Sequence, residues 1–407
     1  MSRGPVAGAA RTPAPADPYR WVVLGAGMAA QAGISAVQLG LPAIAPRMRA
    51  ELGLSLPGVG ALLAAPSLGI ILTLLAWGAL ADRIGERRVI GIGLSGAAVA
   101  LVAAGLVGGA WAVGACLVAA GALGAAANAA SGRAVVAWFP ASQRGFALGW
   151  RHMSTPMGGA IASVGLPLAA AAGGLAAAMG ALAGACAAGA LVAVWLIRAP
   201  AADTAPEPVA GVPVPRDPQV LRDGAIWRLS LGTAAVVLCQ LSILSFIALY
   251  LHDERGWSLG AAAAALAVVQ VAGAISRVAA GAWSDRSHSR LVPLRSIALG
   301  AGVVLAAAVV TLPLSGPLGP VLLVVAGVVA MAGNGVSFAA ASEMVGPRRV
   351  GTALGLQNTV LFVAVVVAPP AFGALVGPLG WGGAFAVAAC CPLVGWAVLA
   401  PLRSRVA

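Results

Sequence analysis

The feature that most constrains this chain is its succession of long apolar runs with few charges inside them. Of its 407 residues, 60% are apolar and only 9% are charged. Gly, Pro and charged clusters divide the chain into twelve runs, most of them near or above the roughly 20 residues that a helix needs to cross a bilayer. The sequence therefore predicts an all-α membrane protein with twelve transmembrane helices, over residues 21–45, 56–81, 89–109, 111–138, 145–172, 175–197, 228–251, 259–283, 291–313, 319–345, 351–376 and 382–402.

One long polar segment, residues 199–227, separates the first six spans from the last six. It is rich in proline and charge, which favours an extended linker. We expect it to join two six-helix bundles, 21–198 and 228–402. The Pro- and Ala-rich residues 1–20 have no apolar core and predict a disordered tail before an uncleaved first helix, because the first apolar run is too long for a signal peptide. Residues 403–407 form a second short tail.

The arginines indicate how the chain is oriented. It has no lysine, and its 24 basic residues produce a net charge of +12. Arginines that bind nucleic acid cluster on one face, whereas these recur at the ends of apolar runs, so we exclude a nucleic-acid partner. Eighteen of them fall on the side of the two termini, and only Arg47, Arg49 and Arg255 fall opposite. By the positive-inside bias, both termini are expected to be cytoplasmic, in a multi-pass plasma-membrane protein.

The loop between the second and third spans carries a specific motif. The segment GALADRIGERR, Gly78 to Arg88, has the pattern G-x-x-x-D-R-x-G-x-R-R. It resembles the loop signature of the major facilitator superfamily, and the resemblance covers essentially all of the chain after Arg20. It implies the major facilitator fold, two pseudo-symmetric bundles with a substrate site between them. In that family the aspartate is held against a helix N-terminus of the other half and joined to the loop arginines, as a clasp that closes the cytoplasmic side. The gating residues so implied are Gly78, Asp82, Arg83, Gly85, Arg87 and Arg88, with Asp285 and Arg286 from a weaker second copy; the alternative is a solvated loop that only follows the positive-inside bias.

The two halves of the chain repeat each other. The sequence GFALG at 145–149 returns as GTALG at 351–355, and Asn128 and Ser131 return as Asn334 and Ser337 at the same offset. Chance similarity between helices rich in Ala and Gly is the alternative. Because the matching residues occupy equivalent spans, we favour two related halves.

Besides Arg228 and Arg295, which fall at the cytoplasmic ends of their spans, five strongly ionisable groups lie inside the predicted spans. An arginine at mid-depth costs about 2.5 to 3.5 kcal/mol on insertion scales, so these groups are functional candidates. Arg277 shares one helical face with Gln270, and its R-x-x-x-G pattern resembles the arginine that meets the substrate carboxylate in monocarboxylate and oxalate transporters; the alternative is a structural pairing. Arg151 is expected to face a cavity, which Arg133 would flank unless it snorkels to the surface. His152 and Glu343 are the candidates for proton coupling, against packing for the histidine and pairing with Arg348, Arg349 or Arg133 for the glutamate.

Uncharged polar residues outline the remaining candidate pathway. They recur on the first, fourth, seventh, eighth, tenth and eleventh spans, and in the family most of these helices line or border the cavity. The alternative for each is an interhelical hydrogen bond. With the two arginines Arg277 and Arg151, the candidate substrate-binding residues are Gln31, Gln38, Asn128, Gln240, Gln270, Asn334, Gln357 and Asn358.

Together these features predict a secondary active transporter of a small solute that works by alternating access. Three arginines against one acid inside the spans favour a small organic or inorganic anion, with coupling to protons or exchange. The stretch WFPASQRGFALGW, Trp138 to Trp150, resembles the anion branches that carry cyanate or nitrate. A drug or metabolite exporter is the first alternative, although Ser154 and Thr155 replace glycines of the antiporter motif. A non-transporting membrane sensor is the second. Isolated histidines and one buried acid offer no catalytic set, and the cysteines have no metal-type spacing, so we expect neither an enzyme nor a cofactor or metal, and a monomer in the bilayer.

Overall fold

The computed structural model describes residues 17–139, 141–198, 218–314, 316–345 and 349–404, and all the regular secondary structure within them is helical. Ten helices of this described part are long and apolar enough to cross a membrane. Short helical pieces connect or follow them: η1 (Leu41–Ile44), α2 (Ala45–Leu52), α7 (Pro218–Arg222) and η2 (Ala400–Ser404). The ten long helices are α1 (Tyr19–Gly40), α3 (Leu56–Ile84), α4 (Glu86–Leu106), α5 (Ala110–Trp138), α6 (Ala141–Leu196), α8 (Gly224–Asp253), α9 (Leu259–Arg286), α10 (Leu291–Thr311), α11 (Leu318–Glu343) and α12 (Val350–Leu399).

Two of the long helices turn back on themselves. The 56 residues of α6 are interrupted at Gly173 and Gly174, and the 50 residues of α12 are interrupted at Gly380. Gly174 and Gly380 have φ of +66° and +67°, a backbone region that glycine enters without steric cost. The second leg of α6 runs back along α1, because Gly158 on the first leg and Ala185 on the second both lie against neighbouring residues of α1. Both breaks fall at boundaries that the sequence predicted.

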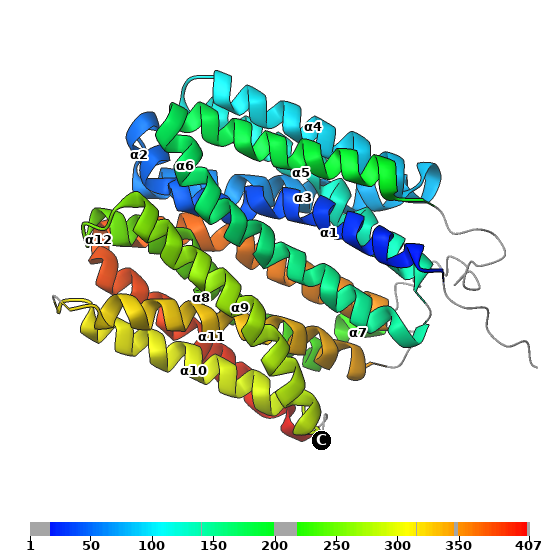
Figure 1. Cartoon of the computed structure of the whole chain (residues 1–407). Helices are drawn as coiled ribbons and strands as arrows, with labels where there is room; N and C mark the ends of the chain where they lie inside the picture. The colour runs from blue at the N-terminus through cyan, green and yellow to red at the C-terminus, as the bar shows by residue number, and fades with distance from the viewer. Residues whose placement is uncertain (1–16, 140, 199–217, 315, 346–348, 405–407) are drawn as a thin grey trace, which may run out of the picture.

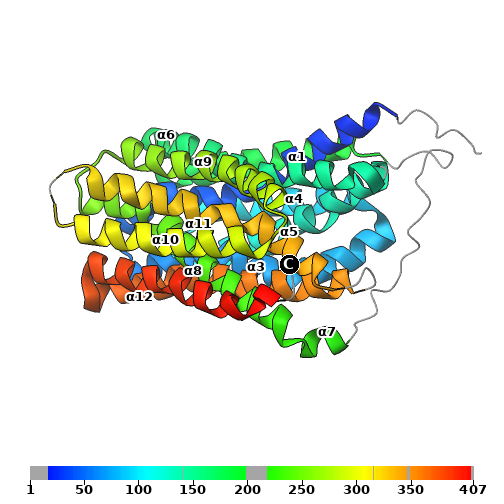
Figure 2. The ribbon, with the colours of Figure 1, turned by 90° about the horizontal axis from the view of Figure 1, so that it is seen from below.

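The helices pack in two groups, which Figure 1 shows one above the other. We call α1 to α6 the N group and α8 to α12 the C group. Helix α1 begins and α12 ends at the same end of the molecule, on the right in Figure 1, which we call the terminal end. Figure 2 shows α7 at this end too, just before α8 begins. The far end is called the opposite end.

Large apolar side chains cover the outer surface of both groups. Leu75, Leu106 and Trp111 are 84%, 81% and 94% exposed, and many other Leu, Val and Trp residues are similarly open. A surface this apolar would aggregate in water, whereas it suits the hydrocarbon of a membrane. The predicted all-helical membrane class is therefore confirmed.

The two groups touch each other at the opposite end. Gly60 of α3 meets Pro369 of α12 so closely that an added Cβ would lie 2.3 Å from the proline oxygen, and Gly373 meets the oxygen of Leu56 in the same way, at 2.5 Å. Nearby, the guanidinium of Arg49 on α2 donates a hydrogen bond to the carboxylate of Asp253 at the end of α8, at a distance of 2.5 Å. Because these glycines have no side chain, α3 and α12 can pack backbone to backbone.

Several predicted boundaries differ from the structure by three to five residues, among them the start of α6 at Ala141 instead of 145, and two of these differences have a clear local cause. The first span ends at Gly40 instead of residue 45, because Pro42 and Pro46 each start a new helical piece. The seventh span begins at Gly224 instead of 228, since the carboxylate of Asp223 accepts a hydrogen bond from the nitrogen of Ala225 and caps the helix. The predicted linker therefore already contains α7 and the start of α8. Its residues 199–217, and the tail residues 1–16 and 405–407, lie outside the described part.

Candidate functional site

A buried arginine lies where α1, α5 and α6 meet. The side chain of Arg151, on α6, is 7% exposed. Its guanidinium donates to Gln31 Oε1 at 2.9 Å, to Ser131 Oγ at 3.0 Å and to the backbone oxygen of Asn128 at 3.1 Å. Gln31 in turn donates to Asn128 Oδ1 at 2.6 Å and to Ser35 Oγ at 3.2 Å. We call Gln31, Ser35, Asn128, Ser131 and Arg151 the arginine cluster.

The sequence of α6 places this arginine inward. Trp150, Met157 and Ile161 are exposed on the outer face, whereas Arg151 and Gly158 are buried. Gly158 lets α6 approach α1 closely, since a Cβ there would lie 2.4 Å from the oxygen of Ala32. Residue 158 follows 151 by seven positions, two helical turns, so the close approach holds the arginine on the same inner face.

The arginine cluster is built from neutral partners. Within the described residues, no carboxylate lies within 4.0 Å of the guanidinium of either Arg151 or Arg277. Amides, hydroxyls and backbone oxygens satisfy N–H donors but leave the charge uncompensated. The site is therefore electropositive.

The C group carries a second set of polar residues. Arg277 of α9 is half-buried and donates to the backbone oxygen of Met331 on α11 at 3.1 Å. The amide nitrogen of Asn334 on α11 donates a hydrogen bond to Oε1 of Gln240 on α8, at a distance of 3.4 Å. Gln357 is fully buried on α12, and neither its amide nitrogen nor its amide oxygen has a hydrogen-bond partner in the described structure. Buried amides are rarely left unpaired in proteins.

The predicted substrate-binding residues do not form one cluster. Gln31, Asn128 and Arg151 are brought together, as are Gln240 and Asn334. The other five are spread over three helices, with Arg277 and Gln270 both on α9. Gln38 donates to Ser67 Oγ and joins α1 to α3, Gln357 and Asn358 lie on α12, and Gln270 lies between the two groups.

Gln270 connects the N group to the C group. Its amide nitrogen donates to Ser163 Oγ on α6 at 2.9 Å and to the backbone oxygen of Leu39 on α1 at 3.2 Å. Gly159 leaves the space for it, because a Cβ there would overlap its Oε1, 1.8 Å away. The sequence assigned Gln270 to a polar face of the eighth span but contained no signal for its partner, which lies 107 residues away.

The loop motif forms a different contact from the predicted clasp. Asp82 pairs with Arg133 of α5, and Glu86 lies 3.5 Å from the same guanidinium. Both partners belong to the N group, so the expected contact with the other half is absent from this described conformation. Arg83, Arg87 and Arg88 are exposed and form no ion pair within it. Arg133 is therefore held by two acids of its own group.

The glycines of the motif have separate outcomes. Gly85 ends α3 with a φ of +84°, a backbone region that glycine enters without steric cost, and so allows the turn into α4. Gly78 has no atom within 4 Å of an added Cβ, so the chain is not packed closely against it in this conformation.

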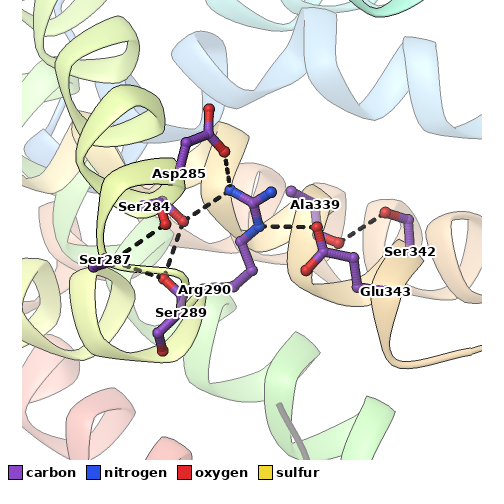
Figure 3. A network of polar contacts seen from close by, with 8 residues as sticks. All are labelled: Ser284, Asp285, Ser287, Ser289, Arg290, Ala339, Ser342 and Glu343. Carbon is purple, nitrogen blue, oxygen red and sulfur yellow. Dashed lines mark hydrogen bonds and ion pairs between the residues drawn. The ribbon is translucent and has the colours of Figure 1, made fainter. Parts of the chain in front are cut away.

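Glu343 is placed differently from the buried acid that the sequence suggested. It is exposed at the terminal end, and its Oε1 accepts from Arg290 Nε at 2.9 Å, whereas Arg133, one of its predicted partners, pairs with Asp82 and Glu86. Arg348, another predicted partner, lies outside the described residues. Arg290 also pairs with Asp285, as Figure 3 shows, and donates to Ser284 Oγ at 3.1 Å. Sequence reasoning missed Arg290, although it follows Asp285 by only five residues. Arg286, the predicted gating partner of Asp285, is exposed. A cavity of about 270 Å³ adjoins this network.

The helices are apolar and long enough to span a bilayer, and they enclose fully or partly buried arginines whose charge no carboxylate compensates. These features define an integral membrane protein with a polar site inside it. Comparison of the sequence identifies the family. Residues 23–360 match the Major Facilitator Superfamily, and the chain belongs to this family. It is therefore a membrane-embedded secondary transporter of a small molecule, and the family is generally non-enzymatic.

Relatives and solved structures agree with this. Uncharacterized MFS-type transporters from two strains of Mycobacterium tuberculosis are each 32% identical over 388 residues, 94% of this chain and 85% of theirs. A bacterial homolog of the human lysosomal transporter Spinster, in an inward-facing and occupied conformation, has a TM-score of 0.80 at 17% identity, covering 96% of this chain and 98% of that one. A peptide transporter in complex with sulfate has a TM-score of 0.76 at 16% identity and covers 94% of each chain. The nucleoside transporter NupG has a TM-score of 0.72 at 13% identity, covering 95% of this chain and 99% of its own.

Proposed function

We propose that this transporter moves a small anion of the monocarboxylate type across the plasma membrane by alternating access, as a monomer coupled to protons or to exchange. Counting each leg of α6 and α12 separately, the chain crosses the membrane twelve times in two six-helix bundles. The anion binds between Arg151 and Arg277, with Gln31, Asn128, Gln240, Asn334, Gln357 and Asn358 as further polar contacts.

The single observation that carries the anion proposal is the missing countercharge. Arg151 is almost fully buried, and its partners in the described residues are all neutral. A buried cation without a carboxylate is costly, and removing a partner from such a charge usually costs several kcal/mol. A bound anion would supply the missing negative charge, so the site selects anions over cations.

The arrangement of the two groups supports alternating access. Their close contacts, Gly60 with Pro369 and Gly373 with Leu56, are at the opposite end. At the terminal end the described ion pairs of Asp82 and Asp285 stay within their own group. We infer that the conformation is open at the terminal end, and that closing this end transfers Asp82 from Arg133 to the C group as the gating step.

The charge distribution supports a cytoplasmic terminal end. Arg83, Arg87, Arg88 and Arg286 are exposed there, whereas Arg255 at the opposite end donates to the backbone oxygens of a neighbouring loop. Positive residues concentrate on the cytoplasmic side of membrane proteins.

The proposal is tested by uptake into proteoliposomes. Radiolabelled lactate, oxalate and cyanate are compared with a lipophilic cation, for the wild type and for Arg151→Gln and Arg277→Gln. We expect saturable anion uptake that each substitution lowers by at least about tenfold, because a charged hydrogen-bonding partner contributes about 1.5 to 3 kcal/mol. The matched control is Arg228→Gln, at an exposed arginine of α8, which should keep wild-type uptake. Saturable flux of the cation alone would overturn the anion proposal.

A further inference from the structure

His152 lies opposite Arg277 across the boundary between the two groups. The first leg of α6 and helix α9 run in opposite directions, and they meet where Gly159 faces Gln270. Seven residues correspond to about two helical turns, so a step of seven from Gly159 to His152 keeps the same face, as does the step from Gln270 to Arg277. Because the helices are antiparallel, the two steps lead to the same height. His152 also interacts electrostatically with both Arg151 and Arg277.

The surroundings of this histidine contain two fixed positive charges and no described negative one. Arg151 contributes from α6 itself and Arg277 from α9. The side chain is accessible, unlike its neighbour Arg151. An imidazole in this position is a third potential cation in a cluster that already has two.

We propose that His152 is the proton-binding group of the transport cycle, so that one proton and one anion bind together between α6 and α9. This inference rests on the proposed function, since it assigns the co-substrate of the same site. Glu343, the other candidate for proton coupling, is exposed and already paired with Arg290 at the terminal end (Figure 3).

The coupling follows from charge balance. A proton on His152 next to two guanidinium groups is disfavoured by repulsion, and an anion between them removes that repulsion. The anion therefore promotes proton binding, and by thermodynamic reciprocity the proton promotes anion binding by the same factor. Loading both partners adds no net charge to the cluster, which suits movement through a low-dielectric barrier. The carrier would return without either of them.

The first experiment uses the purified wild-type chain in weakly buffered detergent solution. Lactate, oxalate and cyanate are added in turn, and binding and the accompanying pH change are recorded at about pH 7. We expect a bound anion to be accompanied by the uptake of approximately one proton. Binding without proton uptake would overturn this inference and leave the anion proposal intact. Failure of all three anions to bind would refute the anion proposal itself.

The second experiment identifies the group. Anion affinity is compared at about pH 6 and about pH 8, on either side of the usual range of histidine, for the wild type, His152→Gln and the control His288→Asn. His288 is exposed at the terminal end in a φ of +49° that asparagine tolerates. Wild type and control are expected to bind roughly tenfold more tightly at the lower pH, while His152→Gln binds equally at both. A pH dependence that persists in His152→Gln would overturn the assignment, whereas a merely structural role would change affinity without changing the pH profile. If that variant does not fold, His152→Asn provides the same comparison, and proton uptake by the wild type still decides whether the coupling exists.

Discussion

Replacing Gly60 by alanine is expected to drive the transporter out of the conformation described above. An added Cβ would lie 2.3 Å from the oxygen and 2.6 Å from the carbonyl carbon of Pro369. Non-bonded carbon atoms keep about 3.5 Å or more between them, so α3 and α12 must move apart by about 1 Å. The obstructing atoms are backbone, and no change of rotamer can relieve the clash.

The size of the effect follows from the cost of overpacking. Inserting a methyl group into a packed contact costs about 1 to 3 kcal/mol. This cost applies only to the conformation in which α3 and α12 touch, since Gly60 packs between the groups and not within one. The ratio of the two conformations should therefore change by about 5- to 150-fold.

The assay is a distance measurement by double electron–electron resonance. Spin labels on Ala50→Cys of α2 and Ala261→Cys of α9, both exposed, report the separation of the groups at the opposite end, in a background without native cysteines. Gly60→Ala should shift the distribution to longer distances. Gly165→Ala of α6 is the matched control, because no atom lies within 4 Å of its added Cβ. A wild-type distance distribution in Gly60→Ala would refute the reasoning.

Three further predictions concern stability and the ends of the bundle. Phe372→Ala should lower the free energy of unfolding by about 3 to 5 kcal/mol, because the buried ring packs 5.0 Å from Phe246 and forms part of an aromatic cluster on α8 and α12; thermal or denaturant unfolding in detergent measures it, and a loss below about 1 kcal/mol would contradict it. The partly exposed pair of Arg49 and Asp253 should contribute only about 0.2 to 1 kcal/mol to closure of the opposite end, measured as the coupling energy of a double-mutant cycle on the same label distance; a coupling of several kcal/mol would show that the pair is shielded from solvent. Gly85→Ala should destabilise the turn after α3 by about 1 to 2 kcal/mol, because φ is +84° there; an unchanged melting temperature would be inconsistent with that backbone conformation.

The helical elements were predictable because their signal is local. Apolar length and the absence of charge predicted the spans, and glycine pairs and proline predicted where α6 and α12 are interrupted. Errors arose where short-range chemistry competed with hydropathy. The cap at Asp223 makes α8 begin four residues before the predicted start. A new helical piece that begins at Pro42 makes α1 end five residues before the predicted end.

The candidate site was predictable only as a set of residue types. Charged and amide side chains inside apolar runs identified Arg151, Asn128 and Gln31, which the structure brings together. The pairing of Asp82 with Arg133 was not predicted, because the family resemblance pointed to a contact with the other half of the chain. A sequence specifies every conformation of a carrier at once, whereas a structure presents one of them.

By itself, the sequence determined that the chain lies in a membrane as helices, that short motifs of its first half return in its second half, and that arginines concentrate at alternate ends of the apolar runs. Each of these depends on hydropathy, spacing or composition along the chain, and these are properties of the local sequence alone. Only the tertiary structure decided that Arg151 is held by neutral partners, that Glu343 is paired and exposed, and that Gln270 joins the two groups. Those outcomes depend on side chains that meet across 53 to 120 residues of chain. The packing of the helices sets such contacts, and the local sequence does not encode them.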